Sequence, residues 1–222
     1  MRIRRAVDLQ ATEKAKALLG KSRHVAKNIP AMAWADVPGF YASLEEPTLT
    51  HLALRLLILN PGVRSKPIRF LRLGQIEGDV WTVPGENLKG RKDATSDFRM
   101  PLVHEAQRII DLARPHARNG FLFPSVRKGV ISDATMSRLM ERRGLEARPH
   151  GFRTSLRTWL AEATDAPHEV AEAMIAHLTD SGVVRAYRRT DFLEQRRVLA
   201  ERWAEHVTGG AGQVVKLAAG VR

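Results

Sequence analysis

The chain has 222 residues, no cysteine and a formal net charge of +12 at pH 7. Without cysteine it forms neither disulfides nor a thiolate zinc site, and no apolar run approaches the roughly 18 residues that span a bilayer. The charge favours a polyanionic partner, most simply nucleic acid. The sequence shows no convincing basic amphipathic helix of the kind that would favour a membrane surface. A soluble, cytoplasmic protein is expected.

The composition of the first third of the chain changes at Pro30. Residues 1–30 are polar and basic, as in a linker or the remnant of a preceding DNA-binding domain. Beyond them, apolar residues at helical spacing between Trp34 and Leu44 predict a short packed helix. Thr48 is then a suitable N-cap for the next helix. Leucines occupy nearly all faces of this helix, which predicts that it is central and buried. Asn60-Pro61-Gly62 is expected to end it.

The middle of the chain alternates between helix and strand patterns. A helix is expected over roughly 67–73, and the helical period returns over 103–112. Between them, three short β-rich runs predict strands at Val80–Val83, Asn87–Lys89 and Phe98–Met100. The fold class is therefore predicted to be mostly α with a small three-stranded antiparallel sheet (α+β), whose basic hairpin tip carries Lys89, Arg91 and Lys92.

The last part of the chain is predicted to be helical. Ser132 or Asp133 is a suitable cap for a helix that Gly144 stops, and four further helices are expected over roughly 152–163, 167–176, 182–189 and 192–207. The last of these has an apolar stripe made of Leu193, Val198, Leu199 and Trp203. A glycine-rich joint follows at 209–212.

A set of nucleophilic and basic side chains occurs in this last part. His150 and Arg153 stand in the string HGFR, His177 follows, and Tyr187 lies in the basic run VRAYRR. Tyrosine has a reference pKa of about 10 and needs cationic neighbours before it becomes a competent nucleophile. A phenol near a histidine and several arginines indicates attack on a phosphate.

Breaking a DNA strand without a metal ion requires side-chain cations that stabilise the phosphate oxygens. Arg64, at the turn before a predicted helix, suits this role because a guanidinium donates two parallel hydrogen bonds and stays protonated. Lys89 on the basic hairpin suits protonation of the leaving 5′-oxygen, and Lys92 on the same hairpin is the alternative.

The order of these residues resembles the catalytic domain of the tyrosine recombinases, the phage integrase family, and especially integrases of prophages and genomic islands. Shorter strings match as well, among them VWTVP, FRMPL, AYRR and RWAEH. The resemblance covers about Pro30 to Val207. The matching positions, in chain order, are Arg64, Lys89, His150, Arg153, His177 and Tyr187.

The resemblance implies the recombinase catalytic-domain fold and site-specific DNA recombination through a 3′-phosphotyrosyl intermediate, with no metal, ATP or other cofactor. Both arginines and His177 would bind the scissile phosphate, while His150 would assist proton transfer. Lys89 would protonate the leaving oxygen and Tyr187 would attack. The implied partners are double-stranded DNA, further copies of the chain in a tetramer on DNA, and an accessory directionality factor.

Two features depart from the family pattern. An acidic residue usually stands three positions after the first arginine, where this chain has Pro67. Family members also carry DNA-binding domains ahead of the catalytic one, and residues 1–30 leave little room for them, as in a natural short form or a fragment. We expect a catalytic domain at 31–207 and a flexible tail at 208–222, in which Val214–Leu217 packs on a neighbouring protomer.

Two other functions stay open on the sequence alone. A type IB topoisomerase-like nicking-closing enzyme shares this chemistry. A truncated, non-catalytic DNA-binding integrase remnant would keep the residues without the reaction.

Overall fold

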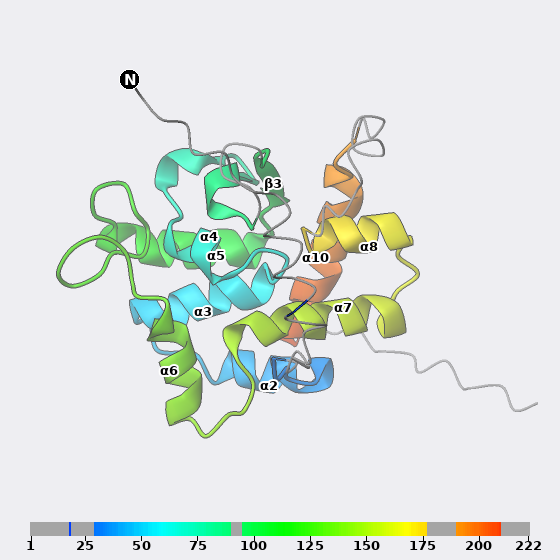
Figure 1. The fold of residues 1–222 in the computed structure, drawn as a ribbon, viewed down its shortest axis with the longest axis horizontal. Coiled ribbons are helices and arrows are strands. Elements are labelled where there is room, and N and C mark those ends of the chain that lie inside the picture. Colours follow the sequence, from blue (N-terminus) through cyan, green and yellow to red (C-terminus); the bar gives the residue numbers. More distant parts are fainter. Residues whose placement is uncertain (1–17, 19–28, 90–94, 177–189, 210–222) are drawn as a thin grey trace, which may run out of the picture.

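The structure is a computed structural model that describes residues 18, 29–89, 95–176 and 190–209. The described residues form a mostly helical domain with one short sheet at its side (Figure 1), and the predicted fold class is confirmed. Its helices are α2 (Val37–Ala42), α3 (Leu49–Leu59), α4 (Ser65–Arg69), α5 (His104–Ala113), α6 (Ala134–Arg142), α7 (Phe152–Ala163), α8 (His168–Met174) and α10 (Leu193–Thr208). Short 3-10 turns join them, among them Trp34–Asp36, Gly85–Asn87 and Pro149–Gly151.

Helix α3 is the central element. It begins after Thr48, whose hydroxyl accepts a hydrogen bond from the His51 amide at 3.3 Å. It ends at Asn60, whose side-chain amide donates to the Leu56 carbonyl at 3.0 Å. Most of its residues are buried, and α4, α5, α6 and α10 pack around it. The predicted central helix and both of its ends are therefore confirmed.

The sheet is antiparallel and has the order β1 (Ile76–Glu77), β2 (Val80–Val83), β3 (Phe98–Pro101). Trp81 at its centre is fully buried and lies opposite Ile76 on one side and Met100 on the other. The prediction of a three-stranded antiparallel sheet is confirmed, and so are the two predicted strands that correspond to β2 and β3.

The predicted strand at Asn87–Lys89 is wrong, because the chain turns away from the sheet after Pro84. Gly85 begins a 3-10 turn, and a Cβ at this glycine would lie 1.8 Å from the Thr95 carbonyl oxygen. The Gly85 amide also donates to the Asp97 carboxylate at 2.9 Å, which fixes the turn against the chain entering β3. The third strand is β1 instead, joined to β2 by a tight turn in which Gly78 takes a φ of 57°.

Helix α4 begins earlier than predicted and is shorter. Arg64 is its N-cap, and Pro67 lies in its first turn, where a missing backbone N–H costs nothing. The proline therefore allows the helix to begin at Ser65. Arg69 ends it, and Leu73 belongs to a separate 3-10 turn at 73–75.

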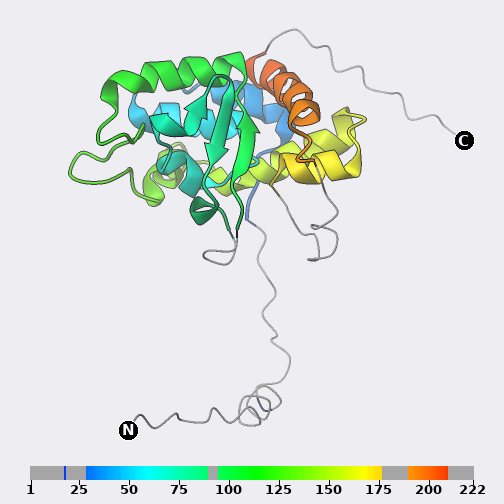
Figure 2. The ribbon, with the colours of Figure 1, turned by 90° about the horizontal axis from the view of Figure 1, so that it is seen from above.

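Helix α10 lies next to the sheet on the β3 side (Figure 2). Trp203 is fully buried and donates from its indole N–H to the Ile58 carbonyl at 2.8 Å, which joins α10 to α3. The predicted apolar stripe is wrong at Val198, which is 55% exposed. A charged residue, Arg196, is completely buried instead.

Several expectations lie outside the described residues. These are the hairpin tip at Arg91 and Lys92, the helix over 182–189, and the tail segment Val214–Leu217. Every helix in the described part of the chain is too short or too polar to span a bilayer.

Candidate active site

Arg64 lies at the end of a tight turn between α3 and α4. The Val63 amide closes this turn by donating to the Asn60 carbonyl at 3.2 Å. Gly62 packs directly on the end of α8, because a Cβ at this position would lie 2.0 Å from the Met174 carbonyl oxygen. Only glycine permits so close an approach. The loop that leads to the half-buried Arg64 is thus held between the central helix and α8.

Arg153, in the first turn of α7, reaches the same loop. Its Nη1 donates to the Gly62 carbonyl at 2.7 Å. Burial, followed by the positive charge of Arg64, lowers the pKa of Arg153 to about 10, and Glu172 on α8 acts in the opposite direction. Arg153 still stays protonated at neutral pH, so two guanidinium charges converge from α4 and α7.

His150 stands one turn earlier, in the 3-10 turn that precedes α7. Burial lowers its pKa, and the charges of Arg64, Arg153 and Lys89 lower it further. The imidazole is therefore neutral at pH 7 in the absence of an anion. In that form it can take or pass on a proton.

Lys89 is exposed and follows the 3-10 turn Gly85–Asn87, on the connection from β2 to β3. Lys66 on α4 donates to the Glu86 carbonyl at 2.6 Å, so the helix that follows Arg64 is tied to the turn that precedes Lys89. No pattern in the sequence indicates this contact. Lys92, the alternative hairpin lysine, lies outside the described residues.

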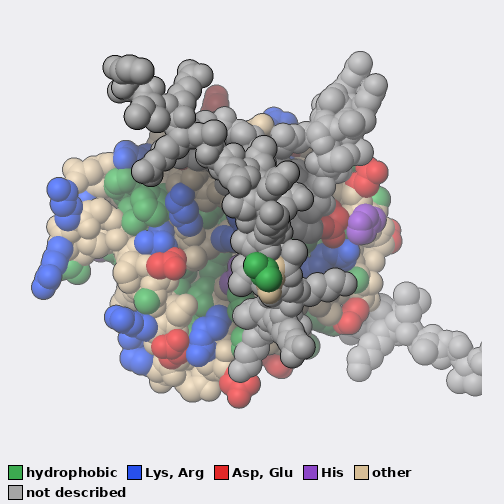
Figure 3. All heavy atoms as spheres, viewed as in Figure 1, with side chains coloured by type: hydrophobic (Ala, Val, Ile, Leu, Met, Phe, Trp, Pro, Cys, Tyr) green, Lys and Arg blue, Asp and Glu red, His purple; other side chains and the backbone are tan. Residues whose placement is uncertain are grey.

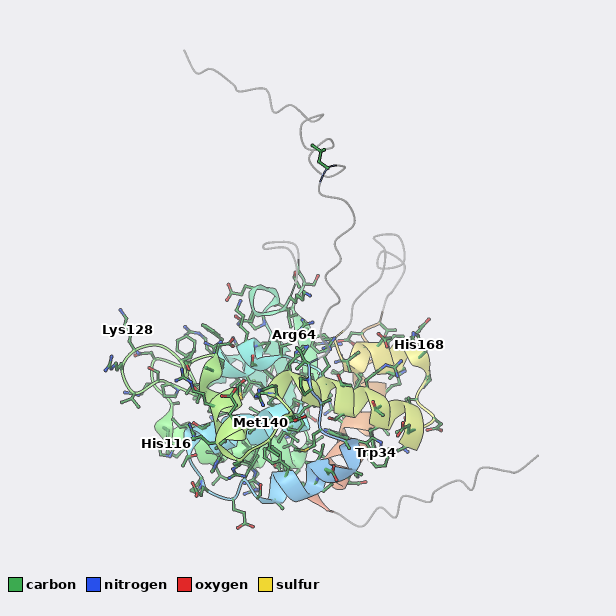
Figure 4. The ribbon with its side chains drawn as sticks, turned by 60° about the horizontal axis from the view of Figure 1, so that its bottom comes forward. Trp34, Arg64, His116, Lys128, Met140 and His168 are labelled. Atoms are coloured by element: carbon green, nitrogen blue, oxygen red, sulfur yellow. The ribbon has the colours of Figure 1, made fainter. Side chains whose placement is uncertain are left out.

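Four of the six predicted site residues are thus brought together by separate elements. Figure 4 shows Arg64 near the middle of one face, with Lys128 and His168 towards opposite ends of the domain. In Figure 3, Lys and Arg side chains recur over the left part of the face seen there, with acidic ones among them. Cations grouped around a neutral imidazole form a site for an anion such as a phosphodiester.

His177 and Tyr187, the remaining two predicted site residues, lie outside the described residues. The chain has only one other tyrosine, Tyr41, and the structure describes it. Tyr41 is 5% exposed, and its hydroxyl donates to the Glu105 carboxylate at 2.6 Å. Burial and the bond to Glu105 raise its pKa well above the usual value, so this phenol is unsuited to nucleophilic attack.

The departure at Pro67 has a structural counterpart. Pro67 is buried in the first turn of α4, so no carboxylate projects from that turn beside Arg64. The acidic group that acts on Arg153 comes from α8: Glu172, which also accepts a hydrogen bond from Arg157 at 3.0 Å. Nothing in the sequence pattern pointed to Glu172.

Two other histidines of the described residues, His51 and His206, make structural contacts. His51 is buried and its ring lies 3.1 Å from the Glu46 carbonyl oxygen, and His206 donates to the Trp34 carbonyl at 2.9 Å. Among residues that the structure describes, no three His, Asp or Glu side chains lie close enough together to hold a metal ion.

Comparison with known proteins is consistent with this geometry. The profile of the phage integrase family matches residues 32–194. The prophage integrase IntA of Escherichia coli K12 is 33% identical over 200 residues, which cover 85% of this chain and 47% of IntA. The integrase of Shigella phage Sf6 is 21% identical over 185 residues, which cover 81% of this chain and 48% of the phage protein. The chain thus spans about half the length of the curated relatives it matches.

Solved structures show the same fold. A lambda integrase dimer bound to a COC′ core site superposes with a TM-score of 0.55 and 17% identity, over 82% of this chain and 70% of that one. A lambda integrase tetramer bound to a Holliday junction gives a TM-score of 0.56 and 16% identity, over 78% of this chain and 56% of that one. The chain therefore belongs to the phage integrase family and has the fold of a tyrosine recombinase catalytic domain.

Proposed function

We propose that residues 31–207 form the catalytic domain of a site-specific DNA recombinase that works through a 3′-phosphotyrosyl intermediate. The observation that carries this proposal is the convergence of Arg64, Arg153 and Lys89 on His150. Three cations from three elements, around an imidazole whose pKa they lower, suit a phosphodiester in which negative charge develops during the reaction.

In the proposed reaction Tyr187 attacks the scissile phosphorus, a phosphorus–tyrosine bond forms and the bond to the 5′-oxygen breaks. Arg64 and Arg153 stabilise the nonbridging oxygens together with His177, and His150 assists the movement of protons. Lys89 supplies the proton that the leaving 5′-oxygen takes up. A 5′-hydroxyl of another strand reverses the step, so the bond energy is conserved and neither ATP nor a metal ion is required.

The choice of Tyr187 as nucleophile is supported by the surroundings of Tyr41. A phenol that is buried, hydrogen-bonded to a carboxylate and raised in pKa cannot reach or attack a phosphate. Since the chain has two tyrosines, the family position at Tyr187 is the remaining one.

The proposed partners are double-stranded DNA and other copies of this chain assembled on it. Lambda integrase, with the same fold, has been solved as a dimer on a core site and as a tetramer on a Holliday junction. By analogy, residues 1–30 would lead from a DNA-binding region and residues 208–222 would form a tail that contacts a neighbouring protomer. An accessory directionality factor is part of the same proposal.

The test is to incubate the chain with duplexes that carry a nick near the crossover point, so that cleavage releases a short strand and traps the intermediate. A covalent adduct that resists denaturant and is absent in Tyr187→Phe is expected. No adduct on any such duplex would indicate a DNA-binding remnant instead. Relaxation of supercoiled plasmid without sequence preference would indicate a topoisomerase.

A further inference from the structure

The segment that enters the domain, Pro30–Met32, runs directly over the turn that carries His150. The Arg148 amide donates to the Pro30 carbonyl at 3.2 Å. The hydroxyl of Ser155, one turn into α7, donates to the Met32 carbonyl. The carbonyls of Pro30 and Met32 thus accept hydrogen bonds from Arg148 and Ser155, which lie on either side of the HGFR string.

Gly151, between His150 and Arg153, is the point of closest approach. A Cβ at this position would lie 2.4 Å from the Pro30 carbonyl oxygen and 2.8 Å from the Cα of Ala31. Its φ of −64° and ψ of −26° are ordinary right-handed values that any residue adopts. The backbone conformation therefore does not require glycine here, whereas the packing of the entering segment does.

The entering segment is also fixed further along α7. The indole N–H of Trp34 donates to the Glu162 carboxylate at 2.8 Å, and the Trp34 carbonyl accepts from His206 at 2.9 Å. Figure 4 shows Trp34 beside the blue helix α2. The segment is therefore held from the catalytic turn to the last turns of α7 and α10.

The start of the same segment shares a pocket with His150. Pro30 and the preceding Ile29 line this pocket of about 540 Å³ together with Asp133, Arg148 and His150. Burial is the largest cause of the lowered pKa of His150. The charged groups that face this imidazole or its pocket are Arg64, Lys89, Arg153, Asp133 and Arg148.

We propose that Pro30–Met32 is a positioning element of the active site. It presses on Gly151 and holds the turn with His150 and the first turn of α7 with Arg153, so that a displacement of the chain at residues 29–32 moves both side chains. A force on the chain ahead of Pro30 is thereby transmitted to His150 and Arg153, which face the phosphate. The effect on catalysis rests on the proposed function, whereas the effect on His150 does not.

The test uses the full chain with Ser155→Ala, which removes the bond to Met32, and Gly151→Ala, whose methyl group overlaps Pro30. Thr154→Ala, an exposed position in the same turn of α7, is the matched control. Hydrogen exchange of the Arg148 amide reports release of Pro30. NMR titration of the His150 ring and the single-turnover rate of adduct formation at saturating DNA report the consequence.

In the released variants the pKa of His150 is expected to rise towards its ordinary value. The rate of adduct formation is expected to fall about tenfold or more with DNA affinity little changed, because a small misplacement of reacting groups is costly. Thr154→Ala is expected to match the unaltered chain in all three measurements.

The proposal is overturned if the Arg148 amide exchanges faster while the pKa of His150 and the rate stay unchanged. If the Arg148 amide stays protected in both variants, Gly151→Ala included, the proposed packing of Pro30 on Gly151 is also contradicted. If the unaltered chain forms no adduct on any duplex, the proposed function fails, and the titration of His150 alone decides the positioning role.

Discussion

At the scale of single residues, His150 reports the electrostatics of the site. Arg64, Arg153 and Lys89 all oppose its protonation, after the larger contribution of burial. Binding of a phosphodiester would neutralise part of that repulsion, so the imidazole would gain proton affinity when DNA arrives. His150 is thus neutral in the free site and becomes a better base once the anion is in place.

Replacing Arg64 by alanine is expected to raise the pKa of His150, because one of the three repelling charges is removed. NMR titration of the histidine ring without DNA measures the shift. Arg108→Ala is the control, since Arg108 lies on α5 and pairs with Glu105 at 2.6 Å. An unchanged His150 titration in Arg64→Ala would show that the two side chains do not interact.

The role of Lys89 can be separated from that of Lys92 by changing the leaving group. Lys89→Ala is expected to slow adduct formation by about 10²–10⁴-fold, the usual range for a general acid. A substrate with sulfur in place of the 5′-bridging oxygen leaves as a thiolate and needs no proton, so it should restore the rate.

Lys92→Ala is the matched control for this experiment, and Arg64→Ala should stay slow with the sulfur substrate. If Lys92→Ala is slow and rescued by sulfur while Lys89→Ala is normal, the assignment of the hairpin lysine is reversed.

At the scale of elements, a buried arginine joins α10 to the sheet. Arg196 donates to the carbonyls of Asp191 and Arg99 at 2.8 and 2.7 Å, and its guanidinium lies 4.5 Å from the Phe98 ring centre. Arg99 in turn holds the Asp191 carboxylate at 2.8 and 2.9 Å. The start of α10 is thereby fixed to β3.

Arg196→Met is expected to destabilise the domain by about 2–4 kcal/mol, because two carbonyls lose their donors and the Asp191 carboxylate loses a buried partner. Urea unfolding at pH 7 measures the change. Arg114→Ala, which removes an exposed pair with Asp111, should change stability by less than about 0.5 kcal/mol. Equal effects in the two variants would show that Arg196 has no special role.

The elements that the sequence predicted well are those with long or strongly marked patterns. Helix α3 has a capping threonine and leucines on all sides, and β2 and β3 alternate around Trp81. Strand β1 was missed because two residues carry no period, and the run after Pro84 was misassigned because its turn depends on the distant Thr95. The burial of Arg196 was hidden because a pattern of apolar residues treats every arginine as exposed.

The site was predictable only as a set of residue types in order. Spacing along the chain cannot show that Lys66 ties α4 to the turn before Lys89, or that Gly151 lies against Pro30. Those contacts depend on how α4, α7 and the entering segment pack. His177 and Tyr187 rest on the family resemblance alone, since they lie outside the described residues.

At the scale of the whole molecule, the net charge of +12 should dominate the binding of DNA. The observed affinity is expected to fall steeply with salt, as bound cations are released from each phosphate that the protein contacts. Gel-shift titrations between about 50 and 200 mM salt measure the slope. Arg64→Ala should reduce the slope by about 1, whereas Arg114→Ala should leave it unchanged. Tight, salt-resistant binding would contradict this prediction.

The most direct test of the proposed chemistry is to identify the residue and the DNA end that are joined in the trapped adduct. The adduct is formed with EDTA and without ATP, digested with protease and nuclease, and sequenced by mass spectrometry. We predict a single modified peptide in which Tyr187 carries the 3′-phosphate of the cleaved strand. Attachment to any other residue, or to a 5′-phosphate, would contradict the assignment of Tyr187 and the mechanism built on it.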